Sequence, residues 1–223
     1  MNPRYAASRR WLQCAIGLCL VLSTVAAWAQ DVHALRSVPP QQKTVLVLGD
    51  SLSAAYGLAP AQGWVALLAR RIAEREPDWR VVNASVSGDT TAGGAARIAA
   101  ALKLHRPHVV VIELGANDGL RGLPLQQTRI NLARMIGAAH GANARVLLVG
   151  MRMPPNYGPD YTEGFARNYS ALAERFDTAL LPFLLQPIAL DRAAYQADNL
   201  HPVAAAQPKL RDHVWRALEP LLR

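Results

Sequence analysis

The chain has 223 residues, with 24 lysines and arginines against 16 aspartates and glutamates, and a formal net charge of +8. Its first 29 residues hold three of the arginines and no acid, so the remaining 194 residues carry 21 basic and 16 acidic side chains, a net charge of about +5. These cations are scattered singly, without a basic run or an aromatic-rich RNA-binding signature, so no nucleic-acid partner is expected.

The N-terminal segment has the layout of a secretory signal. Arginines precede an apolar run over 11–25, and Ala27-Trp28-Ala29 has the small-x-small form of a cleavage site. The run is short for a membrane anchor, which needs about 20 residues, so we predict a cleaved signal peptide over 1–29. Cys14 and Cys19 would leave with it, and the exported chain would contain no disulfide or thiol nucleophile. We therefore expect a periplasmic or secreted protein without stable membrane insertion.

The rest of the chain reads as one domain. Polar residues over 30–43 predict a linker, and 44–223 is long enough for one domain with a substantial core. From there, apolar β-rich runs alternate with stretches rich in Ala, Leu and Arg. The predicted strands are 44–48, 80–83, 108–114, 145–149 and 179–183. The predicted helices are 63–76, 91–104, 124–139, 161–176 and 204–222. This alternation implies an α/β fold, a three-layer α/β/α sandwich with a flavodoxin-like, parallel five-stranded sheet.

Polar clusters stand at the points where predicted strands end. They are Gly49-Asp50-Ser51, Ser87-Gly88-Asp89, Gly115-Ala116-Asn117-Asp118 and, before the last helix, Asp198-Asn199-Leu200-His201-Pro202. In open α/β sheets, ligands bind in the crevice beyond the carboxyl ends of the strands. Four such loops converging on one rim predict an active site.

Ser51 is the candidate nucleophile. At a strand-to-helix turn, it can present its hydroxyl above the sheet and its own N–H at a helix N-terminus, where a developing oxyanion is stabilised. The alternative is an ordinary helix N-cap serine. The turn differs from the nucleophile elbow of α/β-hydrolases, because Ser53 occupies the position that the elbow gives to glycine.

His201 is the candidate base, because Asp198 stands three residues before it and Pro202 follows it. A buried Asp198 carboxylate would fix the imidazole tautomer and stabilise the imidazolium that forms during attack. Alternatively, or in addition, Asp198 caps the final helix. The other histidines are expected to be surface or packing residues: His33, His105, His108, His140 and His213.

Two further residues can complete an oxyanion hole with the Ser51 N–H. Gly88 can offer a backbone N–H, and Asn117 can offer its side-chain amide. Each also has an ordinary interpretation, as a left-handed glycine and as an Asx-turn residue.

Together these blocks resemble those of the SGNH, or GDSL, hydrolases, in order and spacing over about residues 44–210. The resemblance is closest to the periplasmic multifunctional group described as acyl-CoA thioesterase, lysophospholipase and arylesterase. It implies that Ser51 is the nucleophile, that Ser51, Gly88 and Asn117 form the oxyanion hole, and that Asp198 and His201 complete the triad. Ala116 departs from the pattern, since a second glycine is frequent there.

Three acids beside the predicted site raise the question of a metal. Asp50, Asp89 and Asp118 lie on separate loops and could hold a hard cation, but no dedicated ligand loop accompanies them. We expect them to brace the loops through hydrogen bonds to backbone amides. Neither a metal nor a cofactor is expected.

The acyl pocket is expected between loops 120–125 and 151–161. Its predicted wall consists of Met151, Met153, Pro154, Pro155, Tyr157 and Tyr161. The alternative is that these side chains only pack the loop. The predicted activity is hydrolysis of acyl and aryl esters and thioesters, including lysophospholipids, by a monomer through an acyl-enzyme.

Three other functions remain open. A carbohydrate O-deacetylase on the same scaffold would favour a polar pocket. A non-catalytic lipid-binding module would have no need of Asp198, His201 and Asn117 together. A nucleotide-binding domain would carry a glycine-rich loop after the first strand, which this chain lacks.

Overall fold

The structure is a computed structural model that describes residues 42–223. The predicted signal peptide over 1–29 and nearly all of the predicted linker lie outside the described residues. None of the helices within 42–223 has the length and apolar character needed to cross a membrane.

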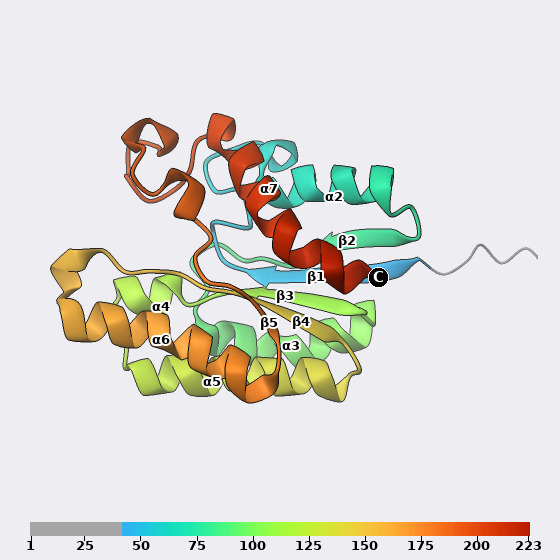
Figure 1. The fold of residues 1–223 in the computed structure, drawn as a ribbon, viewed down its shortest axis with the longest axis horizontal. Helices are drawn as coiled ribbons and strands as arrows, with labels where there is room; N and C mark the ends of the chain where they lie inside the picture. Colours follow the sequence, from blue (N-terminus) through green and yellow to red (C-terminus); the bar gives the residue numbers. More distant parts are fainter. Residues whose placement is uncertain (1–41) are drawn as a thin grey trace, which may run out of the picture. The chain divides into compact units, whose positions relative to one another are not determined.

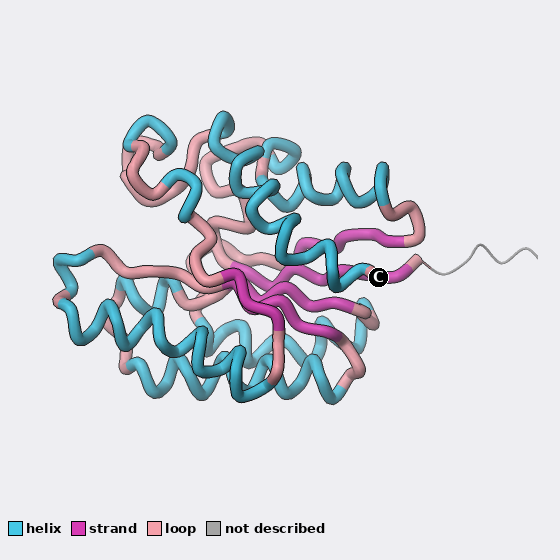
Figure 2. The backbone as a smooth tube through the Cα atoms, in the orientation of Figure 1, coloured by secondary structure: helices cyan, strands magenta, loops and turns pink. Residues whose placement is uncertain are grey.

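Five parallel strands form the central sheet, in the order β2-β1-β3-β4-β5. The strands are β1 (Lys43–Gly49), β2 (Trp79–Asn83), β3 (Val109–Glu113), β4 (Arg145–Val149) and β5 (Ala179–Leu181). Every residue of β3 is buried, as expected of a central strand covered on both faces (Figure 2). The predicted flavodoxin-like sheet is confirmed, and each predicted strand overlaps an observed one.

Helices cover both faces of the sheet and complete three layers. The helices are α2 (Trp64–Arg75), α3 (Thr91–His105), α4 (Ala116–Leu120), α5 (Leu125–Gly141), α6 (Pro159–Phe176) and α7 (Gln207–Leu218). α2 packs against α7 on one face, and α5 packs between α3 and α6 on the other (Figure 1). The predicted three-layer sandwich is therefore confirmed.

The observed helices differ from the predicted ones in two places. The short helix α4 was missed, because five residues after a glycine turn carry no helical periodicity. The predicted helix over 204–222 is helical throughout, but only its middle part, α7, is an α-helix, since η5 (Ala204–Ala206) and η6 (Glu219–Leu222) at its ends are 3₁₀-helical. Pro208 and Pro220 stand in the first turns of α7 and η6, where proline, which has no N–H to donate, is tolerated.

Two features of the fold position the site. In the register between β1 and β3, Gly49 lies beside Glu113, so both strands end at the same edge of the sheet. The buried side chain of Gln207 links two elements near this edge. Its Oε1 accepts a hydrogen bond from the Trp64 N–H at 2.9 Å, and its Nε2 donates to the Pro202 carbonyl at 3.3 Å.

Candidate active site

Ser51 lies on a run of turns that follows β1. The Ala54 N–H donates to the Asp50 carbonyl at 2.9 Å, and the Tyr56 N–H donates to the Ser51 carbonyl at 3.1 Å. No helix begins at Ser51, contrary to the expectation, because Ala55 and Gly57 adopt positive φ angles of 61° and 76° that interrupt helical backbone. The turn, and not the dipole of a long helix, holds the serine.

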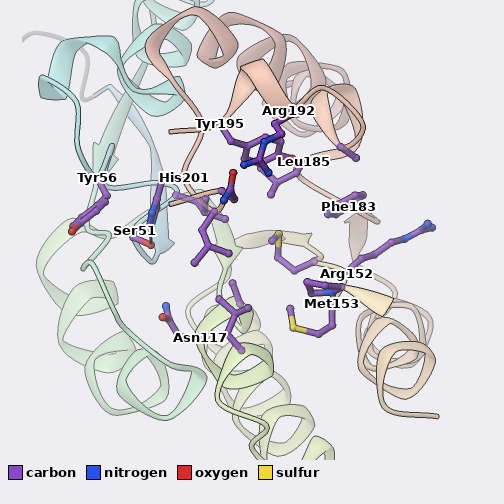
Figure 3. A pocket seen from close by; sticks show the side chains of 18 of the residues that line it. Ser51, Tyr56, Asn117, Arg152, Met153, Phe183, Leu185, Arg192, Tyr195 and His201 are labelled. Carbon is purple, nitrogen blue, oxygen red and sulfur yellow. Dashed lines mark hydrogen bonds between the residues drawn. The ribbon is translucent and has the colours of Figure 1, made fainter. Parts of the chain in front are cut away.

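Ser51, His201 and Asp198 form a hydrogen-bonded chain. The Ser51 Oγ lies 2.8 Å from His201 Nε2 (Figure 3). On the other side of the ring, His201 Nδ1 lies 2.7 Å from Asp198 Oδ2. An ionised Asp198 only accepts hydrogen bonds, so Nδ1 carries the imidazole proton and Nε2 accepts from the serine hydroxyl. The structure thus brings together the three residues that the sequence predicts as a triad, although Ser51 and His201 are 150 positions apart in the chain.

Asp198 differs from the expectation in its surroundings. The prediction that it is buried is wrong, because its side chain is 37% exposed. It does not cap the final helix either, since α7 begins only after Ala206. Its Oδ1 instead accepts from the Leu200 and His201 N–H groups at 2.9 and 3.0 Å. The turn includes Asn199 at φ 60°, a left-handed conformation that asparagine tolerates better than most residues.

These hydrogen bonds set the charge of Asp198. The His201 and Leu200 N–H groups, followed by the hydrogen bond with the imidazole, lower the pKa of the Asp198 carboxyl to about 2. Donors to the ionised form stabilise it even where the group is exposed to water. Asp198 is therefore an anion throughout the physiological pH range.

The His201 loop is clamped to the Ser51 loop by residues that sequence reasoning missed. The Tyr56 and His201 rings lie 4.5 Å apart between centroids. The Gln196 N–H donates to the His201 carbonyl at 2.8 Å, and its side-chain amide donates to the Tyr56 carbonyl at 2.9 Å. No motif marks either residue, because the contact joins segments 140 positions apart.

The three predicted oxyanion donors differ in availability. Ser51 and Gly88 both line the cavity, and no residue within 42–223 accepts a hydrogen bond from their N–H groups. Gly88 has φ +78°, which favours glycine although the space around it is open. The Asn117 amide donates to the Asp89 carbonyl at 2.9 Å and lies 3.4 Å from Asp50 Oδ2. An oxyanion in the cavity would compete with Asp50 Oδ2 for the amide hydrogen of Asn117.

The three acids brace the loops, as predicted. Asp50 Oδ1 accepts from the Leu52 N–H at 3.0 Å, and Asp89 Oδ1 accepts from the Thr90 N–H at 3.0 Å. Asp118 Oδ2 accepts from the Thr91 N–H at 2.8 Å. Each carboxylate therefore ties a loop end to backbone, and this hydrogen bonding needs no cation.

Two carboxyl groups lie buried beneath Ser51. Asp50 and Glu113 are both 0% exposed. Burial, opposed by the Leu52 N–H, raises the pKa of Asp50 to about 6, and burial together with Asp50 raises the pKa of Glu113 well above its usual range. The Ser53 hydroxyl donates to Glu113 Oε2 at 2.6 Å, whereas Oε1 has no hydrogen-bond partner within residues 42–223. In the sequence, the only indication of this buried Asp50–Glu113 pair is that Glu113 ends an otherwise apolar strand.

A cavity of about 700 Å³ opens beside Ser51 and His201. Four of the six predicted wall residues line it: Met151, Met153, Pro154 and Pro155. Tyr157 and Tyr161, predicted as part of this wall, are not among its lining residues. Their hydroxyls donate to the carbonyls of Leu120 and Leu123 at 2.8 and 2.9 Å, so they tie loops together, as the alternative interpretation held for all six.

The opposite wall comes from residues 183–195, which sequence reasoning missed. Its lining side chains are Phe183, Leu185, Ala189, Leu190, Arg192 and Tyr195. In Figure 3, Phe183 and Leu185 lie across from Met153, and Arg192 and Tyr195 continue the wall toward His201. This segment is irregular and carries no motif, so its place in the site follows only from the fold.

Comparisons with known proteins place this geometry in a family. A family model described as the GDSL-like Lipase/Acylhydrolase family matches residues 47–207, most of the chain. The chain belongs to this family. As a GDSL hydrolase, it is an enzyme that hydrolyses carboxylic esters.

Relatives of this GDSL hydrolase cover nearly its full length. It is 51% identical over 205 residues to Esterase TesA of Pseudomonas aeruginosa, covering 92% of this chain and 96% of that protein. It is 42% identical over 205 residues to Thioesterase 1/protease 1/lysophospholipase L1 of Escherichia coli, covering 92% and 91%. A crystal structure of the psychrotrophic esterase EstA from Pseudoalteromonas sp., inhibited by monoethylphosphonate, matches with a TM-score of 0.78 and 40% identity, covering 81% of this chain and 99% of EstA.

Proposed function

We propose that this hydrolase cleaves esters by a Ser51-His201-Asp198 triad through an acyl-enzyme. One observation carries the proposal. The serine hydroxyl lies 2.8 Å from one imidazole nitrogen while the other nitrogen lies 2.7 Å from an ionised carboxylate, and Ser51 and His201 line the same cavity. This is the arrangement that a serine needs in order to lose its proton as it attacks.

The reaction proceeds in two acyl transfers. In the first, Ser51 Oγ attacks the carbonyl carbon while His201 Nε2 takes the hydroxyl proton, and the imidazolium then delivers that proton to the departing alkoxide or thiolate. In the second, His201 takes a proton from water, the hydroxide attacks the acyl-enzyme, and Ser51 regains its hydrogen as the acid leaves. Asp198 stabilises the imidazolium in both steps.

The carbonyl oxygen becomes an anion in each tetrahedral intermediate. The N–H groups of Ser51 and Gly88 are the donors for it, because neither is engaged by a residue of the described domain. Asn117 contributes its amide by exchanging the long contact with Asp50 for the oxyanion. Loss of one such donor typically costs about 10²–10³ in turnover.

The cavity favours an apolar acyl group. Its apolar lining includes Met, Pro, Leu and Phe side chains, which suits medium or long acyl chains and aryl groups better than the hydroxyl-rich surface of a carbohydrate. We infer esters and thioesters as substrates, among them lysophospholipids, in line with the activities named for the relative from E. coli. This lining argues against the O-deacetylase alternative, and the Ser51–His201 contact argues against a non-catalytic module.

We also propose that the enzyme acts as a monomer in the periplasm or outside the cell, after cleavage of the segment 1–29. The arginine-flanked apolar run and its small-x-small end support export. Amino-terminal sequencing of the protein recovered from a bacterial periplasm should begin at residue 30.

Replacement of the nucleophile tests the mechanism. Ser51→Ala should lower the kcat for p-nitrophenyl butyrate by several orders of magnitude, roughly 10⁶-fold at most, and abolish labelling by a fluorophosphonate probe. Ser170→Ala, a change of an exposed α6 serine, is the matched control and should retain full activity. Wild-type turnover by the Ser51→Ala protein would refute the mechanism. A series of p-nitrophenyl esters, an acyl-CoA and a lysophospholipid would then rank the substrates.

A further inference from the structure

The mouth of the cavity exposes an unusual share of apolar surface. Six large apolar side chains within residues 42–223 are markedly exposed, and three of them line this one cavity: Tyr56, Leu190 and Leu200. Leu190 is 102% exposed, so it makes essentially no contact with the rest of the protein. Such a side chain contributes nothing to the core, and a cluster of exposed apolar residues commonly marks an interaction site.

Two cationic side chains line the same mouth. The residues that line the cavity include Arg152 and Arg192 and no aspartate or glutamate. Neither arginine forms an ion pair within the described domain, and Arg152 lies over the Phe183 ring at 5.7 Å from its centroid. The two acids nearest this lining are engaged by other groups. Asp191 accepts from the Ala193 N–H and lies 3.7 Å from the Lys209 ammonium, and Asp198 accepts from the Leu200 and His201 N–H groups and bonds the His201 imidazole.

We propose that this mouth docks on the surface of an anionic phospholipid bilayer. Exposed leucines at the headgroup level bury apolar area, and unpaired arginines beside them are attracted to lipid phosphates. A partner protein with a matching acidic and apolar patch would need a fixed shape, whereas a fluid bilayer accommodates isolated leucines on an irregular loop. The role of docking depends on the proposed function: a cavity that opens toward the bilayer could take up lysophospholipid substrates as they leave it.

Binding to vesicles tests the proposal without reference to catalysis. The protein purified from the periplasm of an expression host is sedimented with vesicles of ether-linked phosphatidylglycerol, whose lipids contain no carboxylic ester, and with vesicles of ether-linked phosphatidylcholine. We expect clear partition into the first and at least about fivefold weaker partition into the second, because each arginine near an anionic surface contributes about that factor.

Matched leucine variants locate the surface. Leu190→Ser should weaken partition about tenfold, because it removes an apolar side chain that would enter the interface. Leu104→Ser is the control: Leu104 is 76% exposed but lies at the C-terminal end of α3, away from the strand ends that carry the cavity, and its loss should leave partition unchanged. Arg152→Gln should lower binding to phosphatidylglycerol and leave binding to phosphatidylcholine unchanged.

Several results would overturn the proposal. They are absence of binding to phosphatidylglycerol vesicles, equal losses in the two leucine variants, and a concentration-dependent dimer that Leu190→Ser disrupts, which would assign the surface to a second copy of the chain. A Ser51→Ala protein should bind vesicles like wild type while hydrolysing no ester. Failure of docking and failure of the proposed mechanism are therefore distinguishable.

Discussion

Two sets of carboxyl groups surround Ser51, and they are held in opposite ways. Asp198, on the His201 loop, is well exposed, yet hydrogen bonds from two N–H groups and the imidazole lower its pKa to about 2. Asp50 and Glu113, beneath the serine, are fully buried, and burial raises their pKa values. The difference teaches that burial and hydrogen-bond donors act against each other: three donors keep Asp198 ionised beside the imidazole, whereas burial outweighs the single backbone donor at Asp50.

The largest effect is expected for the exposed carboxylate, Asp198, and it concerns the rate of ester hydrolysis. Asp198→Asn keeps an oxygen for the two backbone N–H groups but removes the charge opposite His201 Nδ1, so the imidazole loses its stabilised tautomer. We expect kcat to fall by about 10⁴, as for a triad aspartate in other serine hydrolases, with little change in melting temperature. Steady-state assays and calorimetry measure both. Activity within tenfold of wild type would show that an exposed carboxylate plays no such role.

The raised pKa of the buried Asp50 should make the free energy of unfolding depend on pH. Because the folded-state pKa of Asp50, about 6, exceeds its unfolded value of about 3.8, the native state binds this proton more tightly. The associated stability is complete below the unfolded value and is lost as pH rises through about 6, a change on the order of 3 kcal/mol.

Urea unfolding of Asp50→Asn at several pH values between the two limits measures this loss. The variant should lose less stability than wild type as pH rises, because its amide does not ionise. It should also lower the pKa of Glu113, since Asp50 contributes to raising it. Parallel pH profiles of stability in the two proteins would contradict the assignment of Asp50 as a group with a raised pKa.

A smaller effect is expected from the Ser53 hydroxyl, which is hydrogen-bonded to the buried Glu113. Ser53→Ala would remove the only hydrogen bond to Glu113 that a side chain of the described domain provides, and a buried acceptor without its partner costs about 1–3 kcal/mol. Urea unfolding at neutral pH measures it, with Ser170→Ala as the control. Equal stability of Ser53→Ala and wild type would mean that the Ser53 hydroxyl contributes no net stability through its hydrogen bond with Glu113.

The sequence was informative where chemistry depends on a local pattern. Apolar runs predicted all five strands, and residues placed directly after strands, such as Ser51 and Asn117, lie in the site because parallel strands end at one edge. It was uninformative where contacts join distant irregular segments. The wall over 183–195 and the Tyr56–His201 stacking have no local signature. The exposure of Asp198 could not be predicted either, because it depends on how a single turn projects from the domain.

The buried amide of Gln207 gives the His201 loop an anchor outside the loop itself. One end of this amide meets the first N–H of α2 and the other meets the carbonyl of Pro202, directly after the imidazole. The position of the His201 loop therefore depends on two helices outside the loop, α2 and α7, through this one side chain. Anyone grafting this segment onto another scaffold would need to transplant that glutamine and its helix partner as well, because the loop sequence alone does not encode where its histidine stands.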